Sequence, residues 1–422
     1  MKTLSELNTA YHNLFYVEDE ALFPLIVSMI IGARLNAPPV WMYIIGPSSG
    51  GKSSVLSTVN KTSFITELSD LTTNTFLSGM RVADRETSLL KKLGNNFVII
   101  MKDFTTMIAK DEVARGQIIA QMREIYDGYI SKATGNGHII TWGTKEKRNK
   151  GTFIMAATEG IFKIQEEFAD MGTRAINYVF VPQDRKRTTR VSIKNKRNNN
   201  AFNERLGELQ SDVAEFIDYM IAHAPSEFPA LPAELEEEII DVADLSSMCR
   251  SIVIRDYRGE KSLALSAEFP MRMADQLLAI AQFMTYANGG ELTEPMQKCI
   301  YKTAFDSIPK QRRLVLEVAA KYPRIQIGAM SMLMNYQPAL VRAWVEDLHM
   351  FGIIDRIKDG NKEKFKIREE HRVTLKKYLH IETVNSDLET DSDGEVQGIN
   401  EDMTWDEKEA ALQNQKTFDE IF

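Results

Sequence analysis

The sequence predicts an α/β fold built on a mostly parallel, buried sheet, and two observations carry this prediction. Short, predominantly apolar runs occur at residues 40–45, 97–101, 152–157 and 175–182, and stretches with helical spacing separate them. Runs of this kind are typical of parallel strands buried on both faces. Beyond the last run, Leu, Ile, Met and Phe recur at helical spacing over residues 201–288, which predicts a largely helical region.

Five regions follow from these patterns. A helical segment over 1–39 precedes the α/β core over 40–200 and a helical lid over 201–305. Three helices over 310–321, 327–333 and 337–351, closed by a charged hairpin around residue 360, predict a winged helix-turn-helix over 306–382. Residues 383–422 carry a net charge of −10 and leave +2 for the rest of the chain, so they predict a disordered acidic tail.

Composition narrows the class of protein. The 422 residues are 44% hydrophobic and 26% charged, as in globular proteins. No apolar run reaches the roughly 18 residues that a membrane-spanning helix needs, and residues 22–35 read as a buried helix. No secretory signal is recognisable, and Cys249 and Cys299 have no metal-like neighbours in the sequence. We expect a cytoplasmic protein of a bacterial host cell, with a phage or mobile element as a candidate source.

A glycine-rich loop follows the first apolar run and precedes a predicted helix. It matches the pattern G-x-x-x-x-G-K-S, and its residues are Gly46, Pro47, Ser48, Ser49, Gly50, Gly51, Lys52 and Ser53. Amide N–H groups and the helix N-terminus favour bound phosphate at such a loop. Lys52 would reach the β- and γ-phosphates, and Ser53 would bind Mg²⁺. The sequence therefore predicts an ATP and Mg²⁺ site.

A second nucleotide motif is shorter. The apolar run 97–101 leads to Lys102 and Asp103, so it provides one carboxylate where a pair often stands. Asp103 is either the acid associated with the metal or the base that activates water. A third interpretation is an Asp that caps the following loop.

The order of these pieces resembles a known family. The segments LTTNTFLSGM (71–80), ETSLLKKLGNNFVIIMKDF (86–104), QIIAQMREIYDGYISKATGNG (117–137), KGTFIMAATEGI (150–161) and MGTRAINYVF (171–180) are similar to those of AAA+ ATPases. The branch is the one with minichromosome-maintenance helicases, enhancer-binding activators, and helicase-type AAA+ proteins of phages and mobile elements. The resemblance covers residues 40–290. The activators' Gly-Ala-Phe-Thr-Gly-Ala signature is absent, which argues against a transcription activator.

The resemblance implies roles for three more residues. Thr158 falls where the family has a polar sensor of the γ-phosphate, Arg174 where it has an arginine finger acting on the neighbouring subunit, and Arg272 where the lid has its sensor arginine. A guanidinium near the γ-phosphate neutralises charge that develops during transfer. For Arg174 and Arg272, the alternative is a surface ion pair.

Three segments are candidates for nucleic-acid contact. The family places a β-hairpin in the ring channel at residues 128–150, and its candidate DNA contacts here are Lys132, Trp142, Lys145, Lys147, Arg148 and Lys150. The alternative is a solvated loop with Trp142 packed on the core. The basic segment 183–200 is either a contact or a linker. The helix 337–351 with Arg342, and the wing with Lys358, Lys362, Lys364 and Lys366, would contact either DNA or protein.

The combined hypothesis is a ring-forming AAA+ motor, hexameric, that hydrolyses ATP and moves on single-stranded DNA during phage or mobile-element replication. The acidic tail ending at Phe422 would dock a replication partner or serve only solubility. Two rivals stay open. One is a helicase loader or protein remodeller, and the other is a winged-helix initiator or DNA-binding regulator with a nucleotide switch. Only about 39 residues precede the core, which leaves no room for a large N-terminal DNA-binding collar.

Overall fold

The structure is a computed structural model, and it describes residues 1–78, 81–82, 85–86, 88–133, 139–167, 174–181, 184–228, 230–255, 261–264, 266–360 and 362–379. The chain forms two compact units. The first comprises residues 1–239 and 272–304, and the second comprises residues 240–271 and 305–422. The predicted acidic tail and the turn at 135–137 lie outside the described residues.

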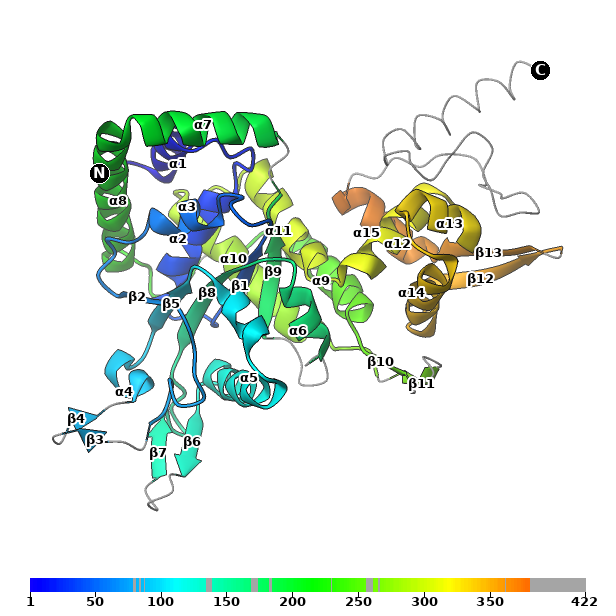
Figure 1. Ribbon diagram of the computed structural model, residues 1–422, viewed down its shortest axis with the longest axis horizontal. Helices are drawn as coiled ribbons and strands as arrows, with labels where there is room; N and C mark the ends of the chain where they lie inside the picture. The colour runs from blue at the N-terminus through cyan, green and yellow to red at the C-terminus, as the bar shows by residue number, and fades with distance from the viewer. Residues whose placement is uncertain are drawn as a thin grey trace. The chain divides into compact units, whose positions relative to one another are not determined.

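The first unit is built on a parallel sheet of five strands (Figure 1). Their order in space is β2 (Ile65–Leu68), β5 (Phe97–Met101), β8 (Gly151–Ala157), β1 (Trp41–Ile45) and β9 (Ala175–Val179). The four apolar runs of the sequence are the four strands β1, β5, β8 and β9, which confirms the predicted parallel sheet. The edge strand β2 is half-exposed, so it has no continuous apolar run that could mark it in the sequence.

Helices cover both faces of this sheet. On one face, α5 (Glu112–Tyr126) and α6 (Ile161–Glu167) contribute Ile118, Met122, Ile125 and Ile161 to a core that includes Phe153. On the other face lie α2 (Leu22–Ala33) and α3 (Lys52–Ser57). Helix α2 is buried from Leu22 to Gly32, as its apolar sequence predicts. The N-terminal segment is therefore part of the sheet unit rather than an appendage to it.

The first unit contains further helices besides α2, α3, α5 and α6. They are α1 (Leu4–Leu14), α4 (Leu89–Leu93), α7 (Arg185–Arg197), α8 (Asn199–Ala222), the start of α9 (Ala233–Cys249), α10 (Met271–Ala287) and most of α11 (Glu294–Asp306). Close packing of α10 on α2 requires a glycine, because a Cβ at Gly32 would lie 2.3 Å from the ring of Phe283. Within the basic segment 183–200, residues 185–197 form the helix α7, so this part is not a flexible linker.

Two small hairpins extend from the first unit. These are β3 (Arg81–Val82) with β4 (Arg85–Glu86), and β6 (Ile130–Ala133) with β7 (Ile139–Trp142). The second is the hairpin predicted between residues 128 and 150. It stands directly before β8 and therefore lies at the amino end of the sheet strands (Figure 1).

The second unit contains three helices followed by an antiparallel hairpin. The elements are α12 (Lys310–Lys321), α13 (Ile327–Met334), α14 (Pro338–Met350), β12 (Ile354–Asp359) and β13 (Lys362–Ile367), with α15 (Glu369–Leu379) after them. A short hairpin of β10 (Val253–Arg255) and β11 (Lys261–Ala264) also belongs to this unit. The predicted helices and hairpin of 310–367 are thus present within one or two residues, whereas β10 and β11 interrupt the predicted helical lid.

Candidate nucleotide site

The glycine-rich loop connects β1 to α3, and its backbone conformation explains its glycines. A Cβ at Gly46 would lie 2.2 Å from the carbonyl oxygen of Phe180, so this position excludes every side chain. Gly51 has φ +99°, in the left-handed region that glycine adopts without strain. The sequence therefore places glycine where the chain passes close to β9 and where it turns into the helix.

Lys52 begins α3 and lies inside this loop. Its side chain is only 8% exposed, and Nζ donates to the carbonyl oxygens of Gly46 (2.8 Å) and Pro47 (2.6 Å). Burial lowers the pKa of Lys52, and the nearby carboxylate of Asp103 opposes that shift. The ammonium is therefore close enough to the Asp103 carboxylate for the two charges to interact.

The residues of the loop fit a bound phosphate. Among the residues that the structure describes, no acceptor within the chain is found for the amide N–H groups of Lys52 and Ser53, which open α3. Two unbonded amide donors and a buried ammonium at a helix start are groups that can hold an anion. Ser53 is exposed and stands beside Lys52, where its hydroxyl could bind a metal ion carried by the phosphates.

The register of the sheet brings the other predicted residues to the same edge. Ile45 pairs with Ala157, and Met101 pairs with Met155. Gly46, Asp103 and Thr158 therefore follow the carboxyl ends of three adjacent parallel strands, β1, β5 and β8. Ligands of open α/β sheets bind at this edge.

A threonine that the sequence interpretation missed links two of these strand ends. Thr105 Oγ1 accepts from the amide of Thr158 (3.2 Å), and the two hydroxyl oxygens lie 3.5 Å apart. Asp103 in turn accepts the amide N–H of Thr105 (2.9 Å) and caps the 3-10 helix η1 (Phe104–Ala109). The signal in the sequence was the pattern Asp-x-Thr directly after an apolar strand.

Asp103 thus has the capping role that the sequence left open as an alternative. A carboxylate has two oxygens and about four acceptor sites, so capping through Oδ1 is compatible with metal binding through Oδ2. The neighbouring Lys102 points to β2 instead, where Nζ pairs with Glu67 at 2.8 Å. Lys102 therefore takes no part in the cluster of Lys52, Asp103 and Thr158.

The two predicted arginines lie at the opposite edge of the sheet. Trp41 pairs with Ala175 at the start of β1 and β9, so Arg174 precedes the amino end of β9. Its guanidinium pairs with Asp127 at 3.2 Å and is 12% exposed. Arg174 is therefore about five strand residues, roughly 16 Å, from the phosphate loop, and it has the ion pair that was its alternative interpretation.

Arg272 requires a correction. It stands one helical turn before Gln276, whose side-chain amide donates to the hydroxyl of Tyr126 (3.0 Å) and to the carbonyl of Arg174 (2.7 Å). The charge of Arg272 also acts on the pKa of Tyr126, which burial raises to about 12. The structure thus groups Arg272 with Arg174 rather than with the chain's own phosphate loop, because contacts of Gln276 fix the start of α10 at the amino edge.

The hairpin prediction also requires a correction at three of its residues. Trp142 is 2% exposed, packs on Phe97 with ring centroids 5.6 Å apart, and donates from Nε1 to the carbonyl of Gly94 (2.6 Å). It is a core residue and offers no face for a base. Lys132 donates to Asn74 (3.0 Å) and Lys150 to the carbonyl of Ala37 (2.7 Å), so both are used within the chain. Lys145, Lys147 and Arg148 remain exposed.

In the second unit, several predicted phosphate contacts are used internally. Arg342 pairs with Glu363 at 2.9 Å, and Lys364 is 1% exposed. Asp347 of α14 is buried and pairs with Arg312 at 3.2 Å. Of the predicted wing residues, Lys358, Lys362 and Lys366 are exposed.

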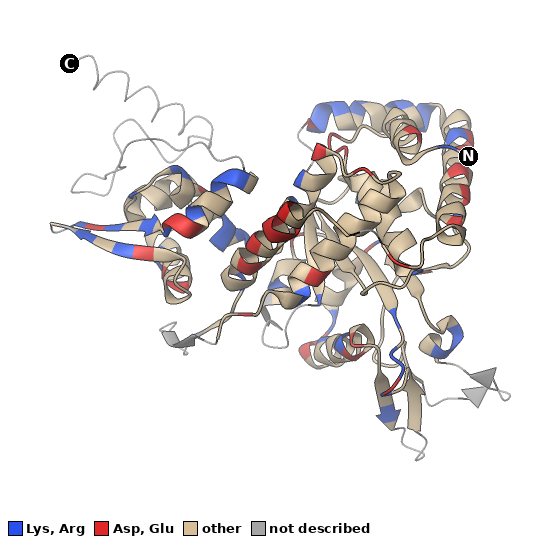
Figure 2. Cartoon of the chain, turned by 180° about the vertical axis from the view of Figure 1, so that it is seen from behind, with Lys and Arg blue, Asp and Glu red and all other residues tan. Residues whose placement is uncertain are grey.

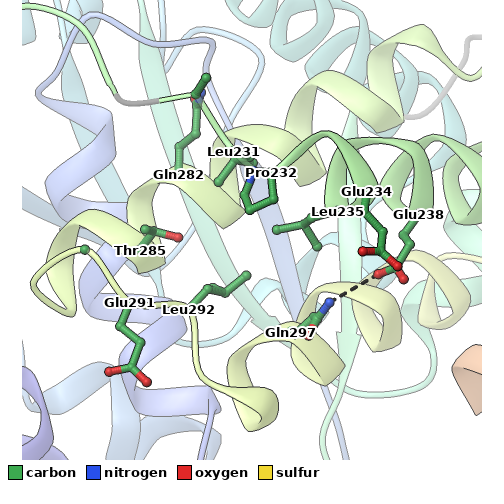
Figure 3. Close-up of a pocket in the computed structure, with 12 residues that line it drawn as sticks. Leu231, Pro232, Glu234, Leu235, Glu238, Gln282, Thr285, Glu291, Leu292 and Gln297 are labelled. Carbon is green, nitrogen blue, oxygen red and sulfur yellow. Dashed lines mark hydrogen bonds between the residues drawn. The ribbon is translucent and has the colours of Figure 1, made fainter.

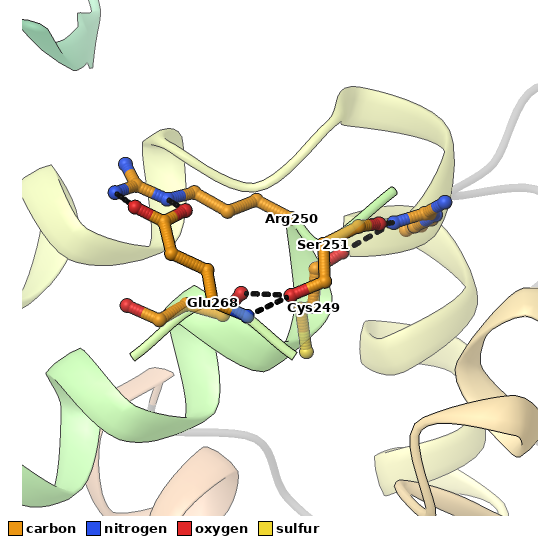
Figure 4. Close-up of polar contacts among 6 residues, drawn as sticks. Cys249, Arg250, Ser251 and Glu268 are labelled. Carbon is orange, nitrogen blue, oxygen red and sulfur yellow. Dashed lines mark hydrogen bonds and ion pairs between the residues drawn. The ribbon is translucent and has the colours of Figure 1, made fainter. Parts of the chain in front are cut away.

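Arg312 also ties α12 to the end of α9 in this unit. It donates to the carbonyl oxygens of Cys249 (2.9 Å) and Ser251 (2.5 Å), while the adjacent Arg250 holds Glu268 with two bonds of 2.7 Å (Figure 4). Burial strongly raises the pKa of the Cys249 thiol. The cysteine is therefore structural here, and the network stabilises the unit rather than forming a reactive site.

A hollow of about 670 Å³ lies elsewhere in the first unit, between the start of α9 and the end of α10. Leu231, Leu235 and Leu292 line it, and Glu238 at its rim accepts from Gln297 at 3.2 Å (Figure 3). None of the predicted nucleotide residues lines this hollow. In the described part of the chain, no three His, Cys, Asp or Glu side chains gather as a metal site, and no helix is both long and apolar enough to cross a membrane.

Comparisons with known proteins give little beyond this geometry. No family model and no curated protein matches the chain. Among solved structures, the chain is similar to one described as the Aeropyrum pernix ORC2 protein in its ADP form. The two sequences are 13% identical, and the match covers 85% of this chain and 91% of that chain. The TM-score of the match is 0.26. A score this low does not establish a common fold, so the class of protein depends on the sheet topology and the loop.

Proposed function

We propose that this chain is a P-loop ATPase of the AAA+ class that binds ATP with Mg²⁺ at the carboxyl edge of its parallel sheet. The observation that carries the proposal is the convergence of Lys52, Asp103 and Thr158 from three adjacent strands. When bound, the metal ion would neutralise charge on the β- and γ-phosphates. Ser53 and Asp103 are the residues that would hold it.

Each side chain has a role in this proposal. Lys52 supplies a positive charge that the loop has already desolvated, so little reorganisation is needed when phosphate charge develops. Thr158 and Thr105, which are within hydrogen-bonding distance of each other, would orient the γ-phosphate and the attacking water. Asp103 would hold the metal through Oδ2 while Oδ1 keeps the cap of η1 in place.

The proposal includes assembly of the chain into a ring, and six is the expected number of subunits. Arg174 and Arg272 are grouped at the edge opposite to their own phosphate loop. In a head-to-tail ring they could approach the γ-phosphate of a neighbouring subunit. An arginine supplied in this way is worth about 10³–10⁵ in turnover rate.

The substrate of the motor is proposed to be DNA, with single strands first, in the replication of a phage or mobile element. The segment between β7 and β8 has three exposed cations, Lys145, Lys147 and Arg148, that can neutralise phosphates. Because Trp142 is buried, it cannot stack on a base, so the proposed DNA contact at this segment depends on its cations alone.

One rival has an observation in its favour. The three helices and hairpin of residues 310–367 have the order of a winged helix, which suits an initiator or regulator that binds duplex DNA and uses its nucleotide as a switch. A loader or protein remodeller is the third candidate. A docking role for the tail ending at Phe422 is also a proposal.

Steady-state ATP hydrolysis tests the proposal, with no nucleic acid, with single-stranded DNA and with duplex DNA, and with Lys52→Ala as the blank. Strong stimulation by single strands supports the motor. A rate indifferent to DNA supports the remodeller, and slow turnover with preference for one duplex sequence supports the initiator. Turnover no greater than that of the blank under all conditions would refute hydrolysis.

A mixing experiment tests the ring. Arg174→Ala subunits should be nearly inactive alone but should regain turnover when mixed with Lys52→Ala subunits, because each kind supplies what the other lacks. If the mixture stays as inactive as its components while both variants assemble, Arg174 does not act on a neighbour.

A further inference from the structure

Helix α7 is the most basic element in the described part of the chain. Its 13 residues include seven cations and no acid, namely Arg185, Lys186, Arg187, Arg190, Lys194, Lys196 and Arg197. Figure 2 shows this charge as a nearly continuous run of Lys and Arg along the helix. No residue of α7 is buried, so hydrophobic packing alone does not explain the helix.

One side of α7 attaches to the rest of the first unit. Thr188, Val191 and Asn195, which lie on one face at helical spacing, are its half-buried residues. Asn195 Nδ2 donates to the carbonyl of Leu14 at 2.8 Å, and Arg187 lies over the ring of Tyr16 at 4.4 Å. Asp184 caps the helix by accepting the amide of Arg187 at 2.8 Å. The helix is thus capped and anchored at both ends.

The cations occupy the opposite side. At 100° per residue, Lys186, Arg190, Lys194 and Arg197 fall within about 80° of one another and face away from the attached side. All four are exposed. Their side chains therefore form a stripe along the helix. Residues four apart are separated by about 6 Å along the axis, so the stripe extends over roughly 16 Å.

Apart from Arg187, which lies over the ring of Tyr16, these charges have no partner within the described part of the chain. There, none of the seven cations of α7 forms an ion pair with a carboxylate, in contrast to Arg342 and Arg174, which both do. Seven like charges on one helix repel one another, which destabilises it. A helix of this composition is expected where a polyanion offsets the repulsion.

We propose that the α7 stripe binds the phosphate backbone of a nucleic acid, independently of the nucleotide site and without reading sequence. The stripe presents charge at regular intervals over a length that matches about five phosphates of one duplex strand. A membrane surface fits less well, because an interfacial helix needs a broad apolar face. Ile193 is the exposed large apolar residue of α7, at 46%.

The test is a titration of fluorescent, homopolymeric single-stranded DNA and of random-sequence duplex DNA with the full chain, without ATP. The variant is Arg190→Gln, Lys194→Gln, Arg197→Gln. A matched control makes the same change in net charge on three separate elements, with Lys91→Gln, Lys163→Gln, Lys298→Gln. Titration of vesicles that contain phosphatidylserine provides the membrane arm, and thermal unfolding verifies that each variant is folded.

We expect the α7 variant to bind DNA about tenfold or more weakly at low salt, and its slope of log affinity against log salt to fall by about 2–3. The control should change little, and basal ATP hydrolysis should be unchanged in both. Equal DNA affinity of the α7 variant and the control would overturn the proposal. So would a loss of vesicle binding in the α7 variant with DNA binding intact. Lys52→Ala should bind DNA like the natural chain, so a failure of the ATPase proposal is separable from a failure of this one.

Discussion

The residues predicted to be functional have different kinds of contacts at the two edges of the central sheet. At the carboxyl edge, Lys52 donates to the phosphate loop, and Thr105 links Asp103 to Thr158 through backbone and hydroxyl groups. At the amino edge, Trp142 is buried in the core and Arg174 is paired with Asp127. The predicted residues are thus grouped beside the phosphate loop at one edge, whereas at the other edge they have contacts within the chain.

Topology accounts for this difference. Parallel strands end together, so residues that directly follow them meet without further specification. At the amino edge, the predicted residues lie on long connections between elements, such as the segment that runs from α5 through the β6–β7 hairpin to β8. Their positions therefore depend on how these connections pack. Packing of the hairpin against Phe97 then decides whether an aromatic side chain faces solvent or core. Motifs are therefore more informative at the carboxyl ends of strands.

The largest expected effect is that of Trp142→Ala on stability. Removing a buried indole that packs on Phe97 and bonds to Gly94 should lower the free energy of unfolding by about 3–5 kcal/mol. Chemical denaturation followed by circular dichroism measures it, with the exposed Lys145→Ala as control. A stable Trp142→Ala protein with specifically weakened DNA binding would instead restore the stacking role.

Lys52→Ala should have the next largest effect, on turnover rather than on folding. Loss of this desolvated charge should lower the rate of ATP hydrolysis by about 10²–10³-fold, as for removal of one preorganised donor. Lys52→Arg keeps the charge but not the compact shape, so it serves as the matched variant. Hydrolysis at the natural rate by Lys52→Ala would separate the loop from the chemistry.

A smaller effect is expected at the exposed segment between β7 and β8. The triple variant Lys145→Gln, Lys147→Gln, Arg148→Gln should weaken single-stranded DNA binding by about tenfold at low salt and reduce the salt slope by about 2. Fluorescence titration at several salt concentrations measures both. Lys150→Gln is the comparison, because its ammonium is bound to Ala37. An equal loss of affinity in Lys150→Gln would contradict the distinction between exposed cations and a lysine whose ammonium is hydrogen-bonded within the chain.

The smallest effect should come from Asp127→Asn. The ion pair with Arg174 involves a carboxylate that is 53% exposed, so solvent screens it and its removal should cost less than about 1 kcal/mol. Thermal unfolding measures this cost. A loss of several kcal/mol would mean that the pair holds the amino edge together, and it would make the trans role of Arg174 difficult to sustain.

Much of the fold could be predicted because it depends on local pattern. Continuous apolar runs gave β1, β5, β8 and β9, and helical spacing with a turn at Gly360 gave the helices and hairpin of residues 310–367. The edge strand β2 was not predicted from the sequence, because it is half-exposed and contains Glu67. The basic segment 185–197 was not predicted as a helix because none of its residues is buried, so it has no apolar stripe that could mark a helix in the sequence.

By itself the sequence determined the phosphate loop, since glycine is required by conformation at Gly51 and by close approach at Gly46. Only the tertiary structure decided which charged and aromatic side chains face solvent and which are buried or bonded within the chain. A lysine or tryptophan has the same local propensity whether it faces solvent or a carbonyl 2.6 Å away, as Trp142 does. The choice depends on chain segments far apart in sequence, which local patterns do not encode.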